Sequence, residues 1–270
     1  MEKKTVAEIT GEKLVEDLLQ RVLDILDAED GRSFDEKKPD IVSILMQNEG
    51  SELADMMLER MAAEQKGREI KNTFWNMGNP IHESSGLELR KVCDTDREKF
   101  LEVRLAYSAL KSFMKEEAYQ TMLWNEHTED TALMFSIFQN GAYAGYCGIH
   151  NVAREVWEIA IELQPGKTNC GIGTRAITTM LHAIKERLGK SDFRVRVEPT
   201  NYASQRLFEK LGAVPNGIFE FSIHDPKLLE ACEEENLHLI DDNLIAAAKK
   251  FSVAPRKLLS HILEYSLKWQ

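Results

Sequence analysis

The chain has 270 residues, of which 43% are hydrophobic and 29% are charged. This balance is typical of a globular protein with a hydrophobic core, and the length suits one large domain or two smaller ones. The net charge of -11 disfavours general binding to the phosphate backbone of nucleic acids. No apolar stretch is long enough to span a bilayer, and the N-terminal residues lack the apolar run of a signal peptide.

The cysteines, Cys93, Cys147, Cys170 and Cys232, are scattered along the chain. None of them forms a C-x-x-C pair, so their spacing predicts neither a disulfide framework nor a metal site. We therefore expect a protein of the reducing cytoplasm.

Residues 1–80 are predicted to be helical. Apolar residues recur on one helical face at Leu14, Leu18, Val22, Ile25 and Leu26. Residues 1–86 hold 11 Lys or Arg against 19 Asp or Glu, so most of the net acidity belongs to this region. We interpret it as a solvated helical surface. Methionines at 56, 57 and 61 leave open a role in binding a protein partner.

Strand and helix patterns follow one another from Leu87 onward. Strands are predicted over 87–92, 131–139, 142–150, 154–163, 193–199 and 214–224, and helices from about 95 past 107, over 115–127, from Gly171 and over 201–213. Asn140-Gly141 has the chemistry of a hairpin turn. The strands before Gly171 therefore form a meander of antiparallel neighbours.

Residues 225–270 are predicted to form a helical C-terminal tail. The segment 244–269 has the outline of a helix, a short turn and a second helix, as in a DNA-reading pair. This outline leaves open that the protein is a DNA-binding regulator with an acyl-CoA-sensing domain. Residues 225–270 hold only 6 Lys or Arg against 8 Asp or Glu, which favours two packed amphipathic helices instead.

A glycine pair stands where the chain leaves a strand and enters a helix. The run from Gly171 to Ala176 fits the dinucleotide motif G-x-G-x-x-A, and an acid, Glu198, ends the next predicted strand. However, residues 164–170 separate the strand from the glycines, and the preceding strands are predicted to be antiparallel. Both features oppose a doubly wound dinucleotide fold.

The same loop suits the pyrophosphate of coenzyme A (CoA). A helix N-terminus offers unpaired N–H groups and the positive end of a dipole, and glycines allow a phosphate to approach closely. A strand that ends at Leu163 could pair with the amide-rich pantetheine arm. The predicted cradle consists of the amides of Asn169, Cys170, Gly171, Ile172, Gly173 and Thr174.

Residues 87–222 resemble the GNAT superfamily of N-acetyltransferases. One mark is the strand, the loop with Pro165 and the Gly171-Ile172-Gly173 helix start; the other is "VEPTNYASQRLFEKLGA". The second run is similar to the branch that acetylates ribosomal-protein N-termini and small amines. The resemblance implies an α+β fold with a mixed, mostly antiparallel sheet flanked by helices. The implied domain covers 87–224, between the acidic helical region 1–80 and the helical tail 225–270.

The resemblance also implies acetyl-CoA as cosubstrate, without a metal. In this family a backbone N–H near Ile161 to Leu163 polarises the thioester carbonyl. Thr168 stands where members usually have Gln or Arg. Asn201 is expected to cap its helix and to touch the pantetheine. Phe208 replaces a frequent tyrosine and is expected to pack on the cofactor arm.

Acetyl transfer requires an amine that loses a proton and a thiolate that is stabilised. Glu158 and Glu162 lie on one face of the strand 157–163, where histone-acetylating relatives carry their base. We expect Glu158 to be the base or a solvent-facing residue, with Glu162 and His150 in reserve. Ser204 matches the thiolate-stabilising serine of the N-terminal-acetylating branch, or it merely caps its helix.

The sequence therefore predicts an N-acetyltransferase that moves an acetyl group directly from acetyl-CoA to a primary amine. The acceptor is a protein N-terminus or a small amine. The alternative is a DNA-binding regulator or interaction module with an acyl-CoA-sensing domain. We expect neither a membrane nor a nucleic acid as a partner. The sequence leaves open whether the chain forms a homodimer.

Overall fold

The computed structural model describes residues 18–28, 30–47, 52–108, 111–220 and 225–270. The predicted helical stretch over 1–17 and the predicted strand end at 221–224 lie outside these residues. The chain divides into two compact units, Met1–Gln65 and Lys66–Gln270. Within the described part, no helix is both long enough and apolar enough to cross a membrane.

The first unit is helical in its described residues. It contains a helix over 18–27, α2 (Phe34–Met46) and the first part of α3 (Glu52–Trp75). Met57 and Met61 pack against the core of this unit, whereas Met56 is exposed. The core itself consists of Leu18, Val22, Ile41, Leu45 and Ala54.

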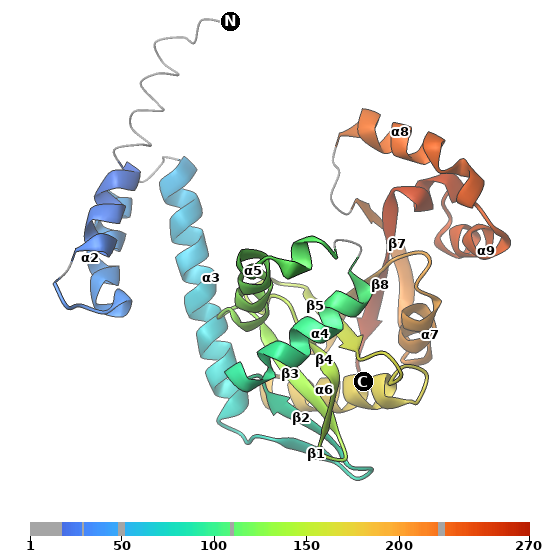
Figure 1. Cartoon of the computed structure of the whole chain (residues 1–270), viewed down its shortest axis with the longest axis horizontal. Coiled ribbons are helices and arrows are strands. Elements are labelled where there is room, and N and C mark those ends of the chain that lie inside the picture. The colour runs from blue at the N-terminus through green and yellow to red at the C-terminus, as the bar shows by residue number, and fades with distance from the viewer. Residues whose placement is uncertain (1–17, 29, 48–51, 109–110, 221–224) are drawn as a thin grey trace, which may run out of the picture. The chain divides into compact units, whose positions relative to one another are not determined.

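The strands of the second unit form one eight-stranded sheet, in the order β1-β2-β3-β4-β5-β6-β8-β7. Their bounds are Ile81–Glu83 (β1), Leu87–Lys91 (β2), Leu133–Gln139 (β3), Ala142–Ile149 (β4), Trp157–Leu163 (β5), Asp192–Val197 (β6), Val214–Glu220 (β7) and His261–Lys268 (β8). Neighbours from β1 to β5 are antiparallel, as the meander predicts, and β5 and β6 are parallel. Figure 1 shows the sheet between its helices.

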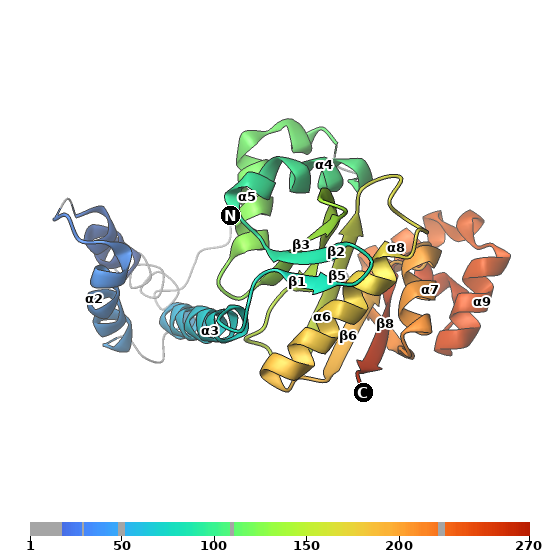
Figure 2. The ribbon, with the colours of Figure 1, turned by 90° about the horizontal axis from the view of Figure 1, so that it is seen from below.

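Helices cover both faces of the sheet. Figure 2 shows α4 (Arg97–Tyr107) and α5 (Glu117–Thr128) on one side and α6 (Ile172–Leu188) on the other. Each side has its own cluster of buried apolar residues. The predicted core face of α6 is confirmed, since Ile172, Ala176, Ile177, Met180, Leu181 and Ile184 are all buried. The predicted α+β fold with a mostly antiparallel sheet is likewise confirmed.

The end of the chain corrects the predicted helical tail. Residues 225–259 contain α8 (Pro226–Glu235), α9 (Asp242–Phe251) and two short 3-10 helices (Leu237–Leu239 and Pro255–Leu259). The chain then returns as β8, which lies between β6 and β7. Leu263, Tyr265 and Leu267 are at most 1% exposed, so every second residue of β8 belongs to the core. The second helix of the proposed DNA-reading pair is therefore absent.

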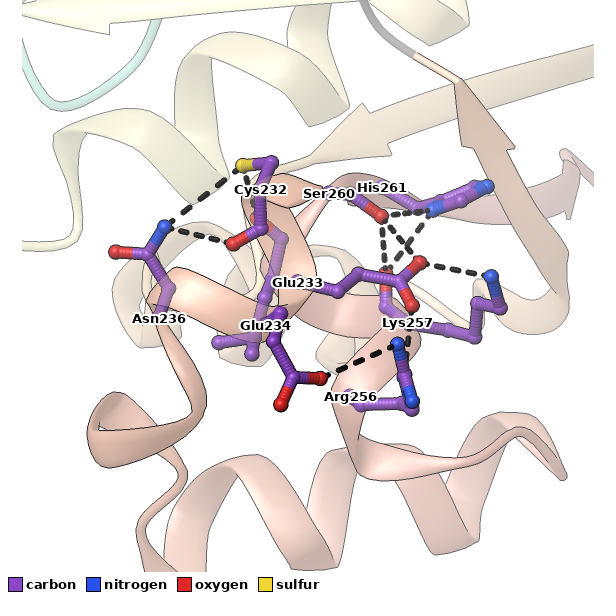
Figure 3. A network of polar contacts seen from close by, with 9 residues as sticks. Cys232, Glu233, Glu234, Asn236, Arg256, Lys257, Ser260 and His261 are labelled. Atoms are coloured by element: carbon purple, nitrogen blue, oxygen red, sulfur yellow. Dashed lines mark hydrogen bonds and ion pairs between the residues drawn. The ribbon is translucent and has the colours of Figure 1, made fainter. Parts of the chain in front are cut away.

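One buried carboxylate connects the helical elements that lie between β7 and β8 (Figure 3). Glu233 on α8 is 1% exposed. It accepts hydrogen bonds from Arg256 (2.8 Å), Lys257 (2.8 Å) and Ser260 (2.9 Å). Burial alone would raise the pKa of Glu233, but these donors lower it below its ordinary value of 4.5. The network joins α8 to the segment that leads into β8.

We predict that Glu233→Gln lowers the free energy of unfolding by about 2 kcal/mol near neutral pH, because charge-assisted hydrogen bonds are lost. The folded-state pKa of Glu233 lies below the unfolded value. Its contribution is therefore complete above the ordinary pKa of 4.5 and disappears as the pH falls through the folded value. Urea unfolding at neutral and acidic pH measures both effects. The neighbouring Glu234→Gln is the control, and an equal loss in both variants would contradict the prediction.

Candidate functional site

The sheet divides between β5 and β6. These parallel strands pair only at Trp157–Phe193 and at Glu158–Arg194, and no further pairing joins them in the described residues. Beyond Glu158, β5 keeps its partner β4 on one edge, with Gly145 opposite Leu163. The other edge of β5 is left without a strand, and we call this opening the fork.

Backbone groups of β5 point into the fork at alternate residues. Gln164 donates its N–H to the carbonyl of Ala144 (2.8 Å), and Glu158 accepts from the N–H of His150 (3.3 Å). The even-numbered residues of β5 therefore bond to β4, and the backbone groups of Ile161 and Leu163 face the fork. This edge can pair with an extended, amide-containing ligand.

The glycine loop stands beside the fork. Gly171 has a φ of 76° and caps the N-terminus of α6, and open space surrounds the position of an added Cβ. Arg175 makes the first helical hydrogen bond, to the carbonyl of Gly171 (3.1 Å). The amides of Ile172, Gly173 and Thr174 thus have no acceptor within the helix. Such amides at the positive end of a helix could hold a phosphate group.

The preceding loop residues are open to solvent. Thr168, Asn169 and Cys170 are exposed, and Asn169 has a φ of 58°. The Cys170 thiol lies 3.3 Å from the carbonyl of Thr168. These exposed loop residues, the free helix N-terminus and the unpaired edge of β5 fit the phosphate and the amide-rich arm of CoA.

Gly173 has a different role from that of Gly171. A Cβ at Gly173 would lie 2.9 Å from Leu207 Cδ1, 3.4 Å from Ile161 Cδ1 and 3.5 Å from Leu163 Cδ1. Its missing side chain therefore lets α6 pack closely on β5 and α7 (Tyr202–Lys210). Only its N–H group, and not the space at its Cα, is available for the phosphate.

We predict that Gly173→Glu lowers the melting temperature by several degrees, because a carboxylate would be forced among apolar side chains without a partner. Gly171→Asn should melt close to the wild type, because asparagine tolerates a left-handed backbone and this position is open. Thermal unfolding by circular dichroism tests both. A Gly173→Glu variant with wild-type stability would show that this side chain faces solvent.

The start of α7 separates two roles that the sequence left open. Asn201 caps the helix, since its side chain accepts the N–H of Ser204 (3.1 Å). Ser204 is therefore not the cap, and in the described residues no hydrogen-bond partner is found for its hydroxyl. Phe208 is 2% exposed and belongs to the core. Nearly all of its surface is covered, so it has little left for contact with a cofactor.

The face of β5 that carries Glu162 holds a cluster of charged and phenolic side chains. Glu162 is the cross-strand neighbour of Tyr146, and its Oε1 lies 2.5 Å from Nη1 of Arg104 on α4. The second oxygen of Glu162, Oε2, is buried, and no hydrogen-bond partner is found for it among the described residues. Such an oxygen is costly unless a ligand donates to it.

The neighbours of Glu162 have shifted proton affinities. Burial and, next, the charge of Glu162 raise the pKa of Tyr146 well above its ordinary value, so its phenol stays protonated. Burial works against the charge of Arg104, but Tyr146 and Glu162 raise its pKa further. The cluster thus combines a fixed cation, a phenol and a carboxylate.

The two other candidate bases lie in different surroundings. Glu158 Oε2 is held by Arg194 (3.0 Å) and Arg196 (3.4 Å), and this carboxylate is therefore already neutralised. The His150 side chain is exposed, but enough protein surrounds it that burial lowers its pKa. It is neutral near pH 7 and can accept a proton only weakly.

The sequence alone did not indicate Arg104 and Tyr146 as part of this cluster. The pairing of Tyr146 with Glu162 depends on the register between β4 and β5, and Arg104 comes from a helix distant in the chain. Alternation along β4 could have placed Tyr146 on the face of Glu162, but not opposite it.

Comparison with known proteins now identifies the domain. Residues 87–214 match the family model described as the acetyltransferase (GNAT) domain. Residues 87–214 are a GNAT acetyltransferase domain. The antiparallel strands before its glycine loop exclude the doubly wound dinucleotide arrangement. No match is found among curated proteins.

Solved structures of acetyltransferases are similar to this chain. RimL, a ribosomal L7/L12 α-N-protein acetyltransferase in complex with CoA, is 13% identical with a TM-score of 0.50, and the match covers 71% of this chain and 98% of that one. RimJ of Mycobacterium smegmatis with CoA-disulfide is 17% identical (TM-score 0.47; 70% and 86% covered). The Salmonella typhimurium enzyme that modifies the N-terminal serine of L7/L12 is 14% identical (TM-score 0.46; 71% and 100% covered).

Across the described ranges, no three His, Cys, Asp or Glu side chains form a group that could hold a metal ion.

Proposed function

We propose that the protein is an acetyl-CoA-dependent N-acetyltransferase that acts on a primary amine, either a protein N-terminus or a small amine, by direct transfer. The observation that carries this proposal is the fork beside the glycine loop, because it offers phosphate-binding amides and an unpaired strand edge together. The GNAT domain match supports acyl transfer, and a relative of the same fold is a CoA complex.

The chain would bind the cosubstrate through backbone groups. The amides from Asn169 to Thr174 would hold the pyrophosphate, and the backbone of Ile161 and Leu163 would pair with the pantetheine arm. When bound, acetyl-CoA supplies an acetyl thioester. A backbone N–H at the fork-facing edge of β5 would donate to the thioester carbonyl and stabilise the charge that develops on it.

Ser204 is the proposed donor to the departing thiolate. Its N–H is taken by Asn201, while its hydroxyl is not used in capping the helix. A hydroxyl at this position can donate a hydrogen bond to sulfur. Phe208 has no proton to give and is covered by the core, so it offers no alternative.

For the acceptor amine, we propose Glu162 in preference to Glu158. The buried Oε2 of Glu162 lacks a donor, which an amine N–H would supply. The nearby Arg104 holds the other carboxylate oxygen and fixes the orientation of the group. Glu158, in contrast, is already paired with two arginines.

The first test is cosubstrate choice. We expect calorimetry to show binding of acetyl-CoA and no binding of NAD, since the fork accepts a pantetheine arm and the sheet is not doubly wound. A screen of small amines and peptide N-termini, followed by release of free CoA, then defines the acceptor. Binding of NAD without any response to CoA would refute the proposal.

The second test separates the two glutamates. Glu162→Gln should lower kcat by about a hundredfold or more, because a general base is removed. Glu158→Gln should mainly lower thermal stability, because it leaves Arg194 without its carboxylate partner and removes one of the two carboxylates that Arg196 contacts. Steady-state kinetics and thermal unfolding of both variants give the comparison. If Glu158→Gln alone loses kcat, Glu158 is the base, as the sequence predicts, and the proposal for Glu162 is wrong.

A further inference from the structure

The segment between β7 and β8 borders an open pocket of about 380 Å³. A volume in this range suits a small molecule or a large side chain. The walls come from α8, α9, the segment ahead of β8 and the loop that joins β6 to α7. The lining residues are Glu198, Pro199, Thr200, Leu229, Cys232, Leu239, Leu244, Leu258, Leu259, Ser260, His261 and Ile262.

The chemistry of the pocket favours a hydrocarbon group attached to a cation. Six of the lining residues are Leu or Ile, and Glu198 is the single acid among them. In the described part of the chain, no partner is found for the carboxylate of Glu198. The surrounding residues 225–260 hold 7 Asp or Glu against 5 Lys or Arg, which also favours a cation.

The pocket lies at the same end of the sheet as the fork. β8 begins at His261 and pairs Leu263 with Val197, so the segment between β7 and β8 meets the carboxyl end of β6. Because β5 and β6 are parallel, the glycine loop leaves β5 at this end too. Thr200 lines the pocket, and the next residue, Asn201, caps α7.

The walls are held in place before any ligand arrives. The Glu233 network ties α8 to Arg256, Lys257 and Ser260, and Ser260 itself lines the pocket (Figure 3). Such a preformed wall reduces the entropy lost when a ligand binds.

We propose that this pocket binds the hydrocarbon part of the acceptor amine, with its ammonium group at the carboxylate of Glu198. The ligand class is a primary amine that carries an aliphatic or aromatic group, and this inference rests on the proposed function. Glu198 directly follows β6 in the loop that leads to α7, at the end of the sheet where the fork opens. Glu198 attracts the acceptor in its ammonium form, and the same nitrogen must then give a proton to Glu162, the proposed base, before it attacks the thioester.

The experiment uses Cys232, which lines the pocket, as a reporter. The full-length protein is treated with methyl methanethiosulfonate, and mass spectrometry of its peptides measures modification at each cysteine. Hexylamine should slow modification at Cys232 and leave the exposed Cys93 unaffected. Protection should strengthen by about fourfold for each added CH₂ between ethylamine and hexylamine.

Two variants complete the design. Glu198→Gln should weaken protection by hexylamine about tenfold and leave protection by hexanol unchanged, because only the amine carries a charge. Cys232→Phe fills the pocket, so it should raise KM for hexylamine and leave KM for ethylamine unchanged. The wild type and Glu198→Gln are compared by thermal unfolding to confirm that both are folded.

The outcomes separate the inference from the proposed function. Acetylation of amines without any protection of Cys232 overturns the pocket assignment while the enzyme activity stands. Protection without acetyl transfer to any amine overturns the acceptor role and the proposed function together. Equal protection by hexanol and hexylamine, unchanged in Glu198→Gln, overturns the ammonium site at Glu198.

Discussion

The division of the sheet after the Glu158–Arg194 pair is the constraint on which the site depends. Two parallel strands that stayed paired would satisfy each other's backbone groups and leave no edge for a ligand. Because β5 and β6 part, the backbone groups of Ile161 and Leu163 face an opening. The ion pairs of Glu158 with Arg194 and Arg196 hold the strands together at the base of this opening.

The position of β8 explains how the long segment between β7 and β8 is compatible with a continuous hydrophobic core. β8 supplies both neighbours, β6 and β7, with a hydrogen-bonded partner, and its buried residues join the main core. The chain between β7 and β8 is then free to vary, since its two ends are fixed by strands. In this protein that segment forms α8 and α9, at the end of the sheet where the fork opens.

Local patterns predicted what depends on local physics. The helical period of α6 and the capping residue Asn201 predicted α6 and the start of α7 correctly. A helix face and a helix cap each depend on residues that are close together in the sequence. The last strand was missed for a related reason. Leu258, Leu259, Ile262 and Leu263 have helical spacing, and this masked the alternation of Leu263, Tyr265 and Leu267 that β8 uses.

The candidate site could be predicted only where one segment carries it. The glycine loop is contiguous, and α6 begins directly after Gly171, as the motif indicates. The amine side, in contrast, is assembled from α4, β4 and β5, which meet through strand register and helix packing. Sequence reasoning therefore selected both glutamates of β5 and placed Glu158 first, whereas we propose Glu162 first. The ranking follows from their partners, because two arginines occupy Glu158, whereas one arginine leaves an oxygen of Glu162 buried and unpaired. A carboxylate in that state gains most from an amine that brings its own N–H donor, and this physical asymmetry connects the fold to the choice of base.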